Sequence, residues 1–179
     1  PERVKPRLER VRSGTWQADL FKLASLTWSV PVSPGFGRRL RYLVWDDDNQ
    51  RLMGILAVGD PVFNLRSRDD YLGWTGEQRR LQLVHIMDAY VLGAVPPYNQ
   101  LLGGKVVASL LRTKEIFDDF MAAYGAREEI ISGKIKQARL AAITTTSSMG
   151  RSSVYNRVKL GKESYLRSIG YSSGYGHFH

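Results

Sequence analysis

One segment, residues 90–111, constrains the fold more than any other part of the chain. It begins with a short apolar run, residues 90–95, which is typical of a buried strand and is ended by two prolines. A loop with Gly103 and Gly104 follows, and an apolar-periodic run then indicates a helix. A strand, a glycine loop and a helix N-terminus in this order present backbone N–H groups to an anion. The sequence therefore predicts a site for a pyrophosphate-bearing ligand here.

This glycine loop has neither of the common nucleotide-binding patterns. It lacks G-x-x-x-x-G-K-[ST], because Lys105 is followed by valine, and it lacks G-x-G-x-x-G. Its residues 100–105, QLLGGK, resemble the Q/R-x-x-G-x-G/A loop of the GNAT acyltransferases, although Lys105 stands where that family has glycine or alanine. The resemblance implies that acetyl-CoA or a related acyl-CoA is held by Gln100, Gly103, Gly104 and Lys105. The alternative is a plain turn before a helix.

The charge balance favours a nucleic-acid partner. The 179 residues suit one domain, and 26 Lys+Arg against 17 Asp+Glu give a formal net charge of +9 and a pI near 9.9. Arginine outnumbers lysine by about two to one, and its planar fork suits phosphates and base edges. We therefore expect DNA as a partner. The alternative is a basic protein whose excess charge is spread evenly over its surface.

The absence of cysteine excludes several kinds of chemistry. With no cysteine in the sequence, disulfides, thiolate catalysis and cysteine-ligated zinc are all excluded. No apolar run approaches the roughly 20 residues that span a bilayer, and no signal peptide is visible, so we expect a cytoplasmic protein without a membrane partner. Because the sequence starts at Pro1 and stops within a strand-like run, we expect a fragment of a longer protein.

Hydrophobic periodicity predicts an α+β fold. Apolar runs at residues 40–45 and 52–58 flank a polar turn and predict a β-hairpin, with Asp46, Asp47 and Asp48 as solvated turn residues. Residues 1–12 are charged and suggest an exposed helical turn or arm, whereas residues 126–137 are ambiguous and could be helical. The other expected elements are a loop over residues 59–75, helices over residues 15–28, 76–87, 103–124 and 152–159, and strands over residues 90–95, 140–146, 165–171 and 175–179.

This order of elements predicts a mixed, mostly antiparallel sheet that is flanked by helices. Such an order resembles the GNAT fold, in which the sheet splays between its central strands and the acyl cofactor enters there. Other α+β proteins share the same order, so the order alone does not decide the function.

Four short motifs are distinctive: residues 68–74 (RDDYLGW), residues 81–88 (LQLVHIMD), residues 144–157 (TTTSSMGRSSVYNR) and IGYSSGYG at residues 169–176. These motifs resemble the DruA family of Druantia anti-phage proteins. The resemblance runs from about residue 40 to the C-terminus. It implies DNA-related work in bacterial defence or in a mobile element, beside a helicase or another defence protein. We therefore divide the chain into an N-terminal helical arm and loop, residues 1–37, and a GNAT-like DruA-type domain, residues 38–179.

Arg68, Asp69 and Trp74 are candidate functional residues in the expected loop. Asp69 could act as a general base, Arg68 could bind a phosphate and Trp74 could stack on a base. The structural alternative is that Asp69 pairs with Arg68 or caps the next helix while Trp74 packs on the sheet.

Tyr155 is a candidate catalytic acid. It lies in the short helix expected after a hydroxyl-rich loop, where the tyrosine of the GNAT fold that protonates the departing thiolate would stand. A phenol with a pKa near 10 can donate a proton at neutral pH. The alternative is a half-buried tyrosine that anchors this helix. No serine is marked out as a nucleophile.

The densest basic segment lies near the C-terminus. Tyrosines, including Tyr165 and Tyr171, alternate with its charges, as in surfaces that hold DNA. We take its members Arg151, Arg157, Lys159 and Lys162 as candidate DNA-binding residues, the alternative being solvated charges.

We predict no metal site. His85 and Asp88 are three residues apart in the expected helix, which permits two ligands, but the sequence offers no third ligand. Two hypotheses then remain open. In one the chain binds DNA through its basic surface, and in the other it is an acyl-CoA-dependent transferase that modifies a nucleobase or a protein.

Overall fold

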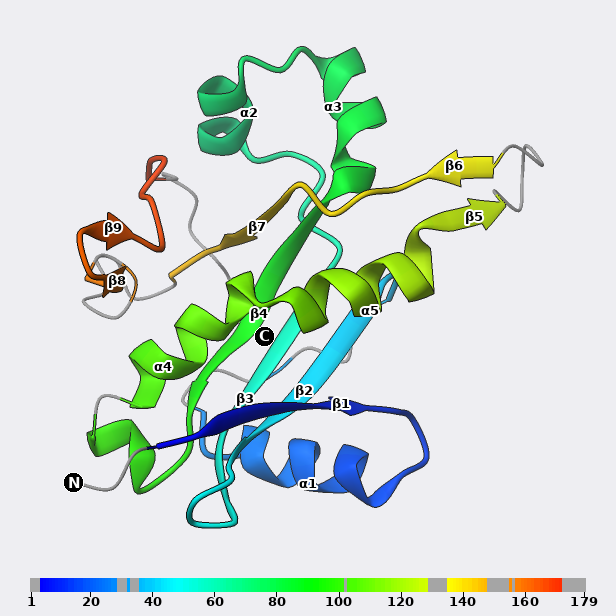
Figure 1. Ribbon diagram of the computed structural model, residues 1–179. Coiled ribbons are helices and arrows are strands. Elements are labelled where there is room, and N and C mark those ends of the chain that lie inside the picture. The colour runs from blue at the N-terminus through cyan, green and yellow to red at the C-terminus, as the bar shows by residue number, and fades with distance from the viewer. Residues whose placement is uncertain are drawn as a thin grey trace.

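The structure is a computed structural model with one central sheet (Figure 1). It describes residues 4–28, 32, 36–101, 103–128, 135–147, 155 and 157–171. The sheet has five strands in the order β1 (Pro6–Val11), β2 (Arg39–Asp46), β3 (Arg51–Gly59), β4 (Ile86–Ala94) and β7 (Ala142–Thr145). Strands β1 to β4 pair antiparallel, and β7 pairs parallel to β4. The predicted α+β class, with a mixed and mostly antiparallel sheet between helices, is confirmed.

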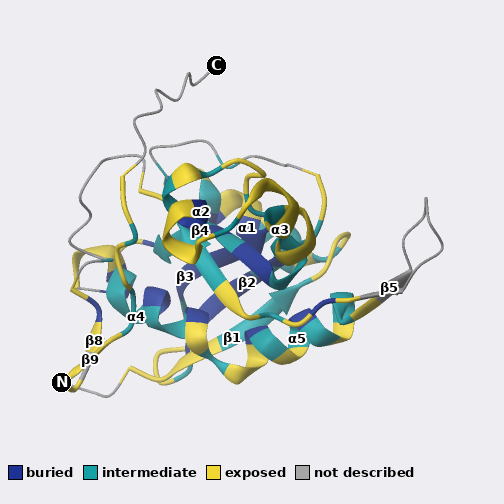
Figure 2. Cartoon of the chain, turned by 90° about the horizontal axis from the view of Figure 1, so that it is seen from above, coloured by how far each residue is buried: buried dark blue, intermediate teal, exposed yellow. Residues whose placement is uncertain are grey.

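The hairpin that the sequence predicted is confirmed as β2–β3, and it lies in the interior of the sheet. Every residue of β3 from Met53 to Gly59 is buried, which is typical of a strand that is covered on both faces. Leu56 and Val58 belong to the core on one face, whereas Ile55 and Ala57 belong to the core on the other. Figure 2 shows the buried residues gathered in β2, β3 and β4.

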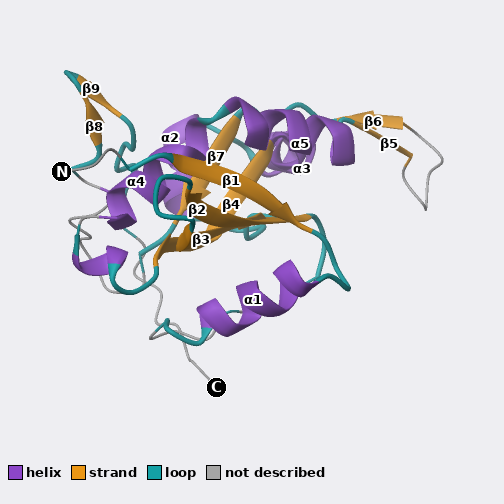
Figure 3. Cartoon of the chain, turned by 60° about the horizontal axis from the view of Figure 1, so that its bottom comes forward, coloured by secondary structure: helices purple, strands orange, loops and turns teal. Residues whose placement is uncertain are grey.

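Helices cover both faces of the sheet (Figure 3). Helix α1 (Trp16–Ser25) lies on one face and inserts Phe21 and Ala24 into that core. The other face carries α4 (Gly103–Ser109), the 3₁₀ helix η3 (Leu110–Arg112) and α5 (Lys114–Tyr124). Their buried side chains are Val107, Leu111, Ile116 and Phe120.

The predicted single helix over residues 103–124 is wrong in one respect. Thr113 has an extended backbone, with φ −76° and ψ 153°, so it ends η3 and precedes α5 as its N-cap residue. The apolar positions on both sides of Thr113 nevertheless pack on the same core, and this explains why the periodicity continues across the break.

The connection from β3 to β4 contains two short helices, of which only the first lies where the sequence predicted a loop. Helix α2 (Arg66–Leu72) ends at Gly73, which has φ 67°, a conformation that favours glycine. Helix α3 (Gly76–Gln82) follows and continues as the 3₁₀ helix η1 (Leu83–His85). The helix expected over residues 76–87 therefore ends at residue 85, and β4 begins earlier than predicted.

Three further predictions are corrected at the edges of the fold. Residues 6–11 are strand β1 and not a helical arm. Strand β1 pairs with β2 in the central sheet, and α1 packs on that sheet. Residues 126–137 contain the strands β5 (Ala126–Glu128) and β6 (Ile135–Gln137), so the helical alternative is wrong. The only strands described after residue 157 are β8 (Lys159–Leu160) and β9 (Glu163–Ser164), so the strand expected over residues 165–171 is wrong.

The other predicted C-terminal elements lie mainly outside the described residues. The strand expected over residues 175–179 lies there, and so does most of the helix expected over residues 152–159. Among the described residues, no helix is long and apolar enough to cross a membrane.

Candidate functional site

The loop that follows β4 is tied to the turn between β2 and β3. The 3₁₀ helix η2 (Tyr98–Gln100) lies in this loop, and the Tyr98 hydroxyl donates to Asp46 Oδ2 at 2.8 Å. Asp46 also accepts from Asn49 Nδ2 at 2.6 Å and from the backbone N–H groups of Lys5 and Asp48. Burial alone raises the pKa of Asp46, but these hydrogen bonds hold it below its usual value. The prediction that Asp46 is a solvated turn residue is therefore wrong, because the carboxylate is fully buried.

The four residues predicted to hold a cofactor lie around the start of α4. Gln100 ends η2 and is exposed, Gly103 begins α4 and is buried, and Gly104 and Lys105 are half-buried. A Cβ atom on Gly103 would lie 2.5 Å from the Tyr98 carbonyl oxygen. Close packing of η2 against α4 therefore explains this glycine without a ligand.

Strand β7 lies beside only the first half of β4. Strand β7 pairs with β4 only from Ile86 to Ala89, whereas β4 continues to Ala94. Among the described residues, no strand pairs with the rest of this edge of β4. On that side, the backbone N–H and C=O groups of Tyr90 to Ala94 therefore form no hydrogen bonds with β7, and such groups need another partner.

Asp88 and Tyr155 lie near each other at the junction of β4 and β7. The Thr144 hydroxyl donates to Asp88 Oδ1 at 2.7 Å. Burial raises the pKa of Asp88, and this effect is partly offset by the Thr144 hydrogen bond and by the charge of Arg68. Burial also raises the pKa of Tyr155. The nearby charge of Asp88 raises this pKa as well, whereas a hydrogen bond with Thr145 lowers it. Tyr155 thus holds its proton at neutral pH, in keeping with the predicted donor role, which stays a prediction.

Sequence reasoning did not select Asp88 as a member of such a site. The signal was present, because Asp88 is an acidic residue within the apolar run of β4. The sequence places Asp88 with His85 on an expected helix, but His85 ends η1 and Asp88 lies in the strand. His85 Nδ1 accepts a hydrogen bond from the Arg139 backbone N–H at 3.1 Å. The described residues contain no group of three or more potential metal ligands.

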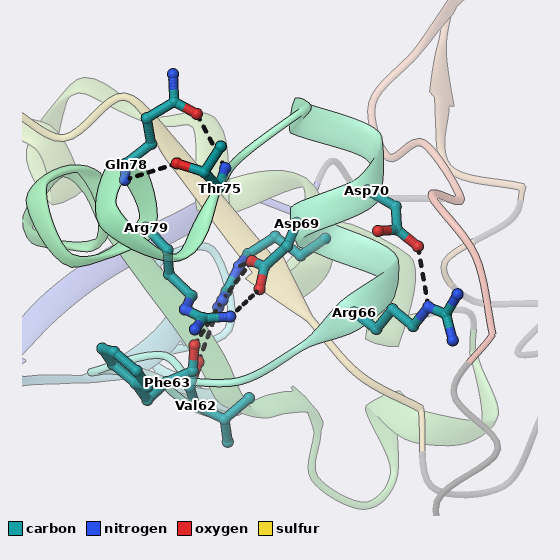
Figure 4. A network of polar contacts seen from close by, with 9 residues as sticks. Val62, Phe63, Arg66, Asp69, Asp70, Thr75, Gln78 and Arg79 are labelled. Atoms are coloured by element: carbon teal, nitrogen blue, oxygen red, sulfur yellow. Dashed lines mark hydrogen bonds and ion pairs between the residues drawn. The ribbon is translucent and has the colours of Figure 1, made fainter.

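Arg68, Asp69 and Arg79 form a closed ionic network between α2 and α3. Figure 4 shows the Asp69 and Arg79 side chains of this network pointing toward each other. Arg68 is fully buried and donates from Nε and Nη2 to Asp69 Oδ1 at 2.9 and 2.7 Å. Its remaining bonds go to the carbonyl oxygens of Val62 and Phe63. Arg79 Nη1 donates to Asp69 Oδ2 at 2.9 Å.

This network leaves little capacity for the roles predicted for Arg68 and Asp69. Burial acts to raise the pKa of Asp69, but the hydrogen bonds from Arg79 and Arg68 keep the pKa below its usual value, so the carboxylate is a weak base. The Arg68 guanidinium lies 5.9 Å from the ring of Trp74, which is half-buried. The geometry agrees with the structural alternative, in which Arg68 and Asp69 hold the α2–α3 connection together.

The basic residues near the C-terminus are exposed. Arg157, Lys159 and Lys162 lie around the hairpin β8–β9, and Arg167 follows it, whereas Arg151 lies outside the described residues. None of these four described cations forms an ion pair with another described residue. We call residues 157–171 the basic strip.

The basic strip is fixed to the body of the protein at both ends. Val158 is buried, and Arg112 of η3 donates to Glu163 Oε1 at 3.0 Å. At the other end, the Arg167 guanidinium lies over the Tyr71 ring of α2 at 5.4 Å. A Cβ atom on Gly170 would lie 2.9 Å from Ser67 Cβ, so this part of the strip packs closely on α2. The exposed cations are thus held in a defined arrangement between η3 and α2.

Comparison with known proteins identifies the family. The family model described as Druantia protein DruA matches residues 1–179. A Druantia protein DruA of Escherichia coli (strain UMEA 4076-1) is 65% identical over 179 residues, which are 100% of this chain and 44% of that relative. This chain therefore spans less than half the length of the curated relative. No solved structure matches. Because the family match covers the whole sequence, the chain belongs to the DruA family of Druantia anti-phage defence proteins.

Proposed function

We propose that this chain is a DNA-binding part of an anti-phage defence protein and that it binds DNA through the basic strip. The observation that carries the proposal is the exposure of Arg157, Lys159, Lys162 and Arg167 without acidic partners among the described residues. Exposed cations that are not neutralised within the protein are available to replace the counterions of a phosphate backbone.

The charge of the strip supports this proposal. Residues 157–171 contain four basic residues and a single acidic residue, Glu163, which pairs with Arg112. Many of the other basic residues are already engaged: Arg7, Arg10 and Lys114, for example, pair with aspartates. With four basic residues and one acidic residue, the strip carries a net charge of +3 over one short segment, which can attract a polyanion. Arg68 is buried and is not part of the proposed interface.

Membership of the DruA family suggests what DNA binding would serve. A Druantia protein that holds DNA in the cytoplasm would present it to a helicase or to another protein of the same defence system. The chain corresponds to 44% of its curated relative, so further activities of the whole protein can lie in the remaining length.

The test measures the affinity of the purified chain for labelled DNA by fluorescence anisotropy at salt concentrations from 50 to 200 mM. Replacing Lys159 and Lys162 by glutamine should weaken binding and reduce the slope of log K against log salt by about 0.7–0.9 for each phosphate that the variant no longer neutralises. Lys22 of α1 is the matched control, because it is also exposed but lies on another face. Failure of the folded chain to bind DNA, or an equal loss of affinity in Lys22→Gln, would contradict the proposal.

A second candidate function is acyl transfer, and the observation that favours it is that β7 pairs with β4 only from Ile86 to Ala89. In the GNAT proteins that the sequence resembles, the acyl cofactor enters where the sheet splays. Here Gln100, Gly104 and Lys105 would lie near the pyrophosphate, and Tyr155 would protonate the departing thiolate. Because internal packing already explains Gly103, the glycine loop adds no independent support.

Calorimetric titration of the chain with acetyl-CoA tests this second candidate. Micromolar binding that is lost in Lys105→Glu would support it, because a negative charge at the helix start should repel pyrophosphate. Lys114→Glu, at the start of α5, provides the matched control. Absence of binding in folded protein would remove acyl-CoA donors from consideration and leave DNA binding as the function.

A further inference from the structure

We propose that the basic strip binds single-stranded DNA and that unpaired bases stack on two arginine–tyrosine pairs, which Tyr165 and Arg167 of the strip form with Arg112 and Tyr71. This inference deepens the proposed function and rests on it, because it names the form of DNA that the strip accepts. Proteins that bind single strands without reading the sequence combine a cationic track with flat side chains on which bases stack. Both parts are present here.

The first pair is Arg167 over Tyr71. The Arg167 guanidinium lies 5.4 Å from the centre of the Tyr71 ring, and Arg167 itself is exposed. Tyr71 is 47% exposed on α2, so the pair lies at the surface. With one side of the guanidinium on tyrosine, its other side can receive a base, since guanidinium planes stack on aromatic faces.

The second pair is Arg112 over Tyr165, with 4.5 Å between the guanidinium and the ring centre. The Arg112 side chain is 48% exposed, and its bond to Glu163 fixes the guanidinium beside β9. The backbone N–H of Tyr165 donates to the Val158 carbonyl at 2.9 Å, which fixes the tyrosine as well. Both members are therefore positioned before a ligand arrives, which lowers the entropy cost of binding.

The two pairs lie on the same segment as the unpaired cations. In each pair one residue belongs to the strip and the other to the body of the protein. Tyr165 of the strip contacts Arg112 of η3, and Arg167 of the strip contacts Tyr71 of α2. Arg157, Lys159 and Lys162 come just before them in the sequence and are exposed. A single strand could thus meet cations along its phosphates and planar groups along its bases.

The shape of the strip favours a single strand over a duplex. A major groove accepts an α-helix or a two-stranded ribbon, but β8 and β9 have only 2 residues each, and residues 161–171 contain no described helix. In a duplex the base faces are covered by neighbouring bases, so the arginine–tyrosine pairs could not stack on them. Their exposed faces are useful only to bases that are already unstacked.

The experiment compares a 30-nucleotide oligo-dT with a 30-base-pair duplex at the same salt concentration by fluorescence anisotropy, using the whole chain. We expect the single strand to bind at least about 10-fold more tightly. Tyr71→Ala should weaken single-strand binding by roughly 5- to 100-fold, the range measured for loss of one stacked base, and should leave duplex binding unchanged. Tyr71→Phe should retain the affinity.

Arg167→Lys separates stacking from charge. The substitution keeps the cation but removes the planar guanidinium, so single-strand affinity should fall while the salt slope stays the same. Trp16→Ala is the control, because Trp16 is an exposed aromatic residue, 61% accessible, at the start of α1 on the other side of the sheet.

The outcomes distinguish this inference from the proposed function. Equal or tighter binding of the duplex would overturn the single-strand inference and leave DNA binding intact. A single-strand preference that survives both Tyr71→Ala and Arg167→Lys would overturn stacking on this pair. If the folded parent chain bound neither form of DNA, the proposed function itself would be overturned.

Discussion

The Tyr98 hydroxyl donates a hydrogen bond to the buried Asp46 carboxylate, with 2.8 Å between Oη and Oδ2. The two residues are 52 positions apart, one at the end of β2 and the other in the loop after β4. Asp46 gathers donors from several segments, so its charge is compensated inside the fold. The contact therefore fixes the loop that leads into α4 against the central hairpin.

Tyr98→Phe should lower the free energy of unfolding by about 1–3 kcal/mol. The substitution keeps the ring in place and removes one donor from a buried, charged acceptor, which costs more than loss of a neutral hydrogen bond. Urea denaturation measures the change. Tyr71→Phe is the control, because Tyr71 is half exposed, and it should change the free energy by less than about 0.5 kcal/mol. Equal effects would mean that the Tyr98 hydrogen bond contributes nothing specific.

Gly103→Ala should destabilise the fold, whereas Gly76→Ala should not. Both glycines are the first residue of a helix. A Cβ atom at position 103 would lie 2.5 Å from the Tyr98 carbonyl oxygen, but at position 76 the nearest atom is the tip of Arg79 at 3.7 Å. We expect a loss of about 1–3 kcal/mol for the overpacked site. Thermal unfolding of both variants measures the difference, and a neutral Gly103→Ala would show that the loop can move away.

The sequence predicted the parts of the fold that depend on local periodicity. The apolar runs around residues 46–50 specify the β2–β3 hairpin. Apolar spacing also predicted a helix at α1 but not its buried face, because Trp16 and Leu23 are exposed whereas Phe21 is buried. The break at Thr113 could not be predicted in this way, because η3 and α5 bury the same face. Short pairings such as β5–β6 depend on contacts across the chain, which local patterns do not contain.

The candidate sites were predictable to different extents. Exposed cations at Arg157, Lys159 and Lys162 follow from composition, because a dense basic segment is costly to bury. The burial of Arg68 was not predictable, because carbonyl oxygens of the preceding loop supply part of its hydrogen bonds. The contact between Asp88 and Thr144, 56 residues apart, arises only from the parallel pairing of β4 with β7.

Arg68→Met should be among the most destabilising substitutions in the chain. Removing the guanidinium leaves the Asp69 carboxylate with one ionic partner and leaves the Val62 and Phe63 carbonyls without their donor. Breaking a buried pair in this way costs about 3–5 kcal/mol. Arg66→Met is the control two residues away, because its pair with Asp70 is exposed and worth at most about 0.5 kcal/mol. Similar urea midpoints for the two variants would contradict the role assigned to Arg68.

Asp88→Asn should raise the free energy of unfolding at neutral pH and leave it unchanged in acid. Burial raises the folded-state pKa of Asp88 above its unfolded value of 3.8, so the folded state favours the protonated carboxyl. Below pH 3.8 both states hold the proton and the charge costs nothing. As the pH rises through the folded-state pKa, the carboxylate must ionise in its half-buried site and stability is lost. The amide in Asp88→Asn avoids this loss and can still accept the Thr144 hydrogen bond.

Denaturation curves of Asp88→Asn and the parent chain between pH 3 and 8 measure this difference. Asp69→Asn should behave in the opposite way, because Arg79 and Arg68 hold the pKa of Asp69 below its usual value. Its carboxylate stabilises the fold above pH 3.8, and this contribution is lost as the pH falls through the folded-state pKa. If Asp88→Asn instead lowered stability at neutral pH, Asp88 would be stabilised as a carboxylate by Arg68 and Thr144. A half-buried acid that costs stability at neutral pH is expected where a carboxyl group serves binding or chemistry, so the result also decides whether the β4–β7 junction warrants a search for substrates.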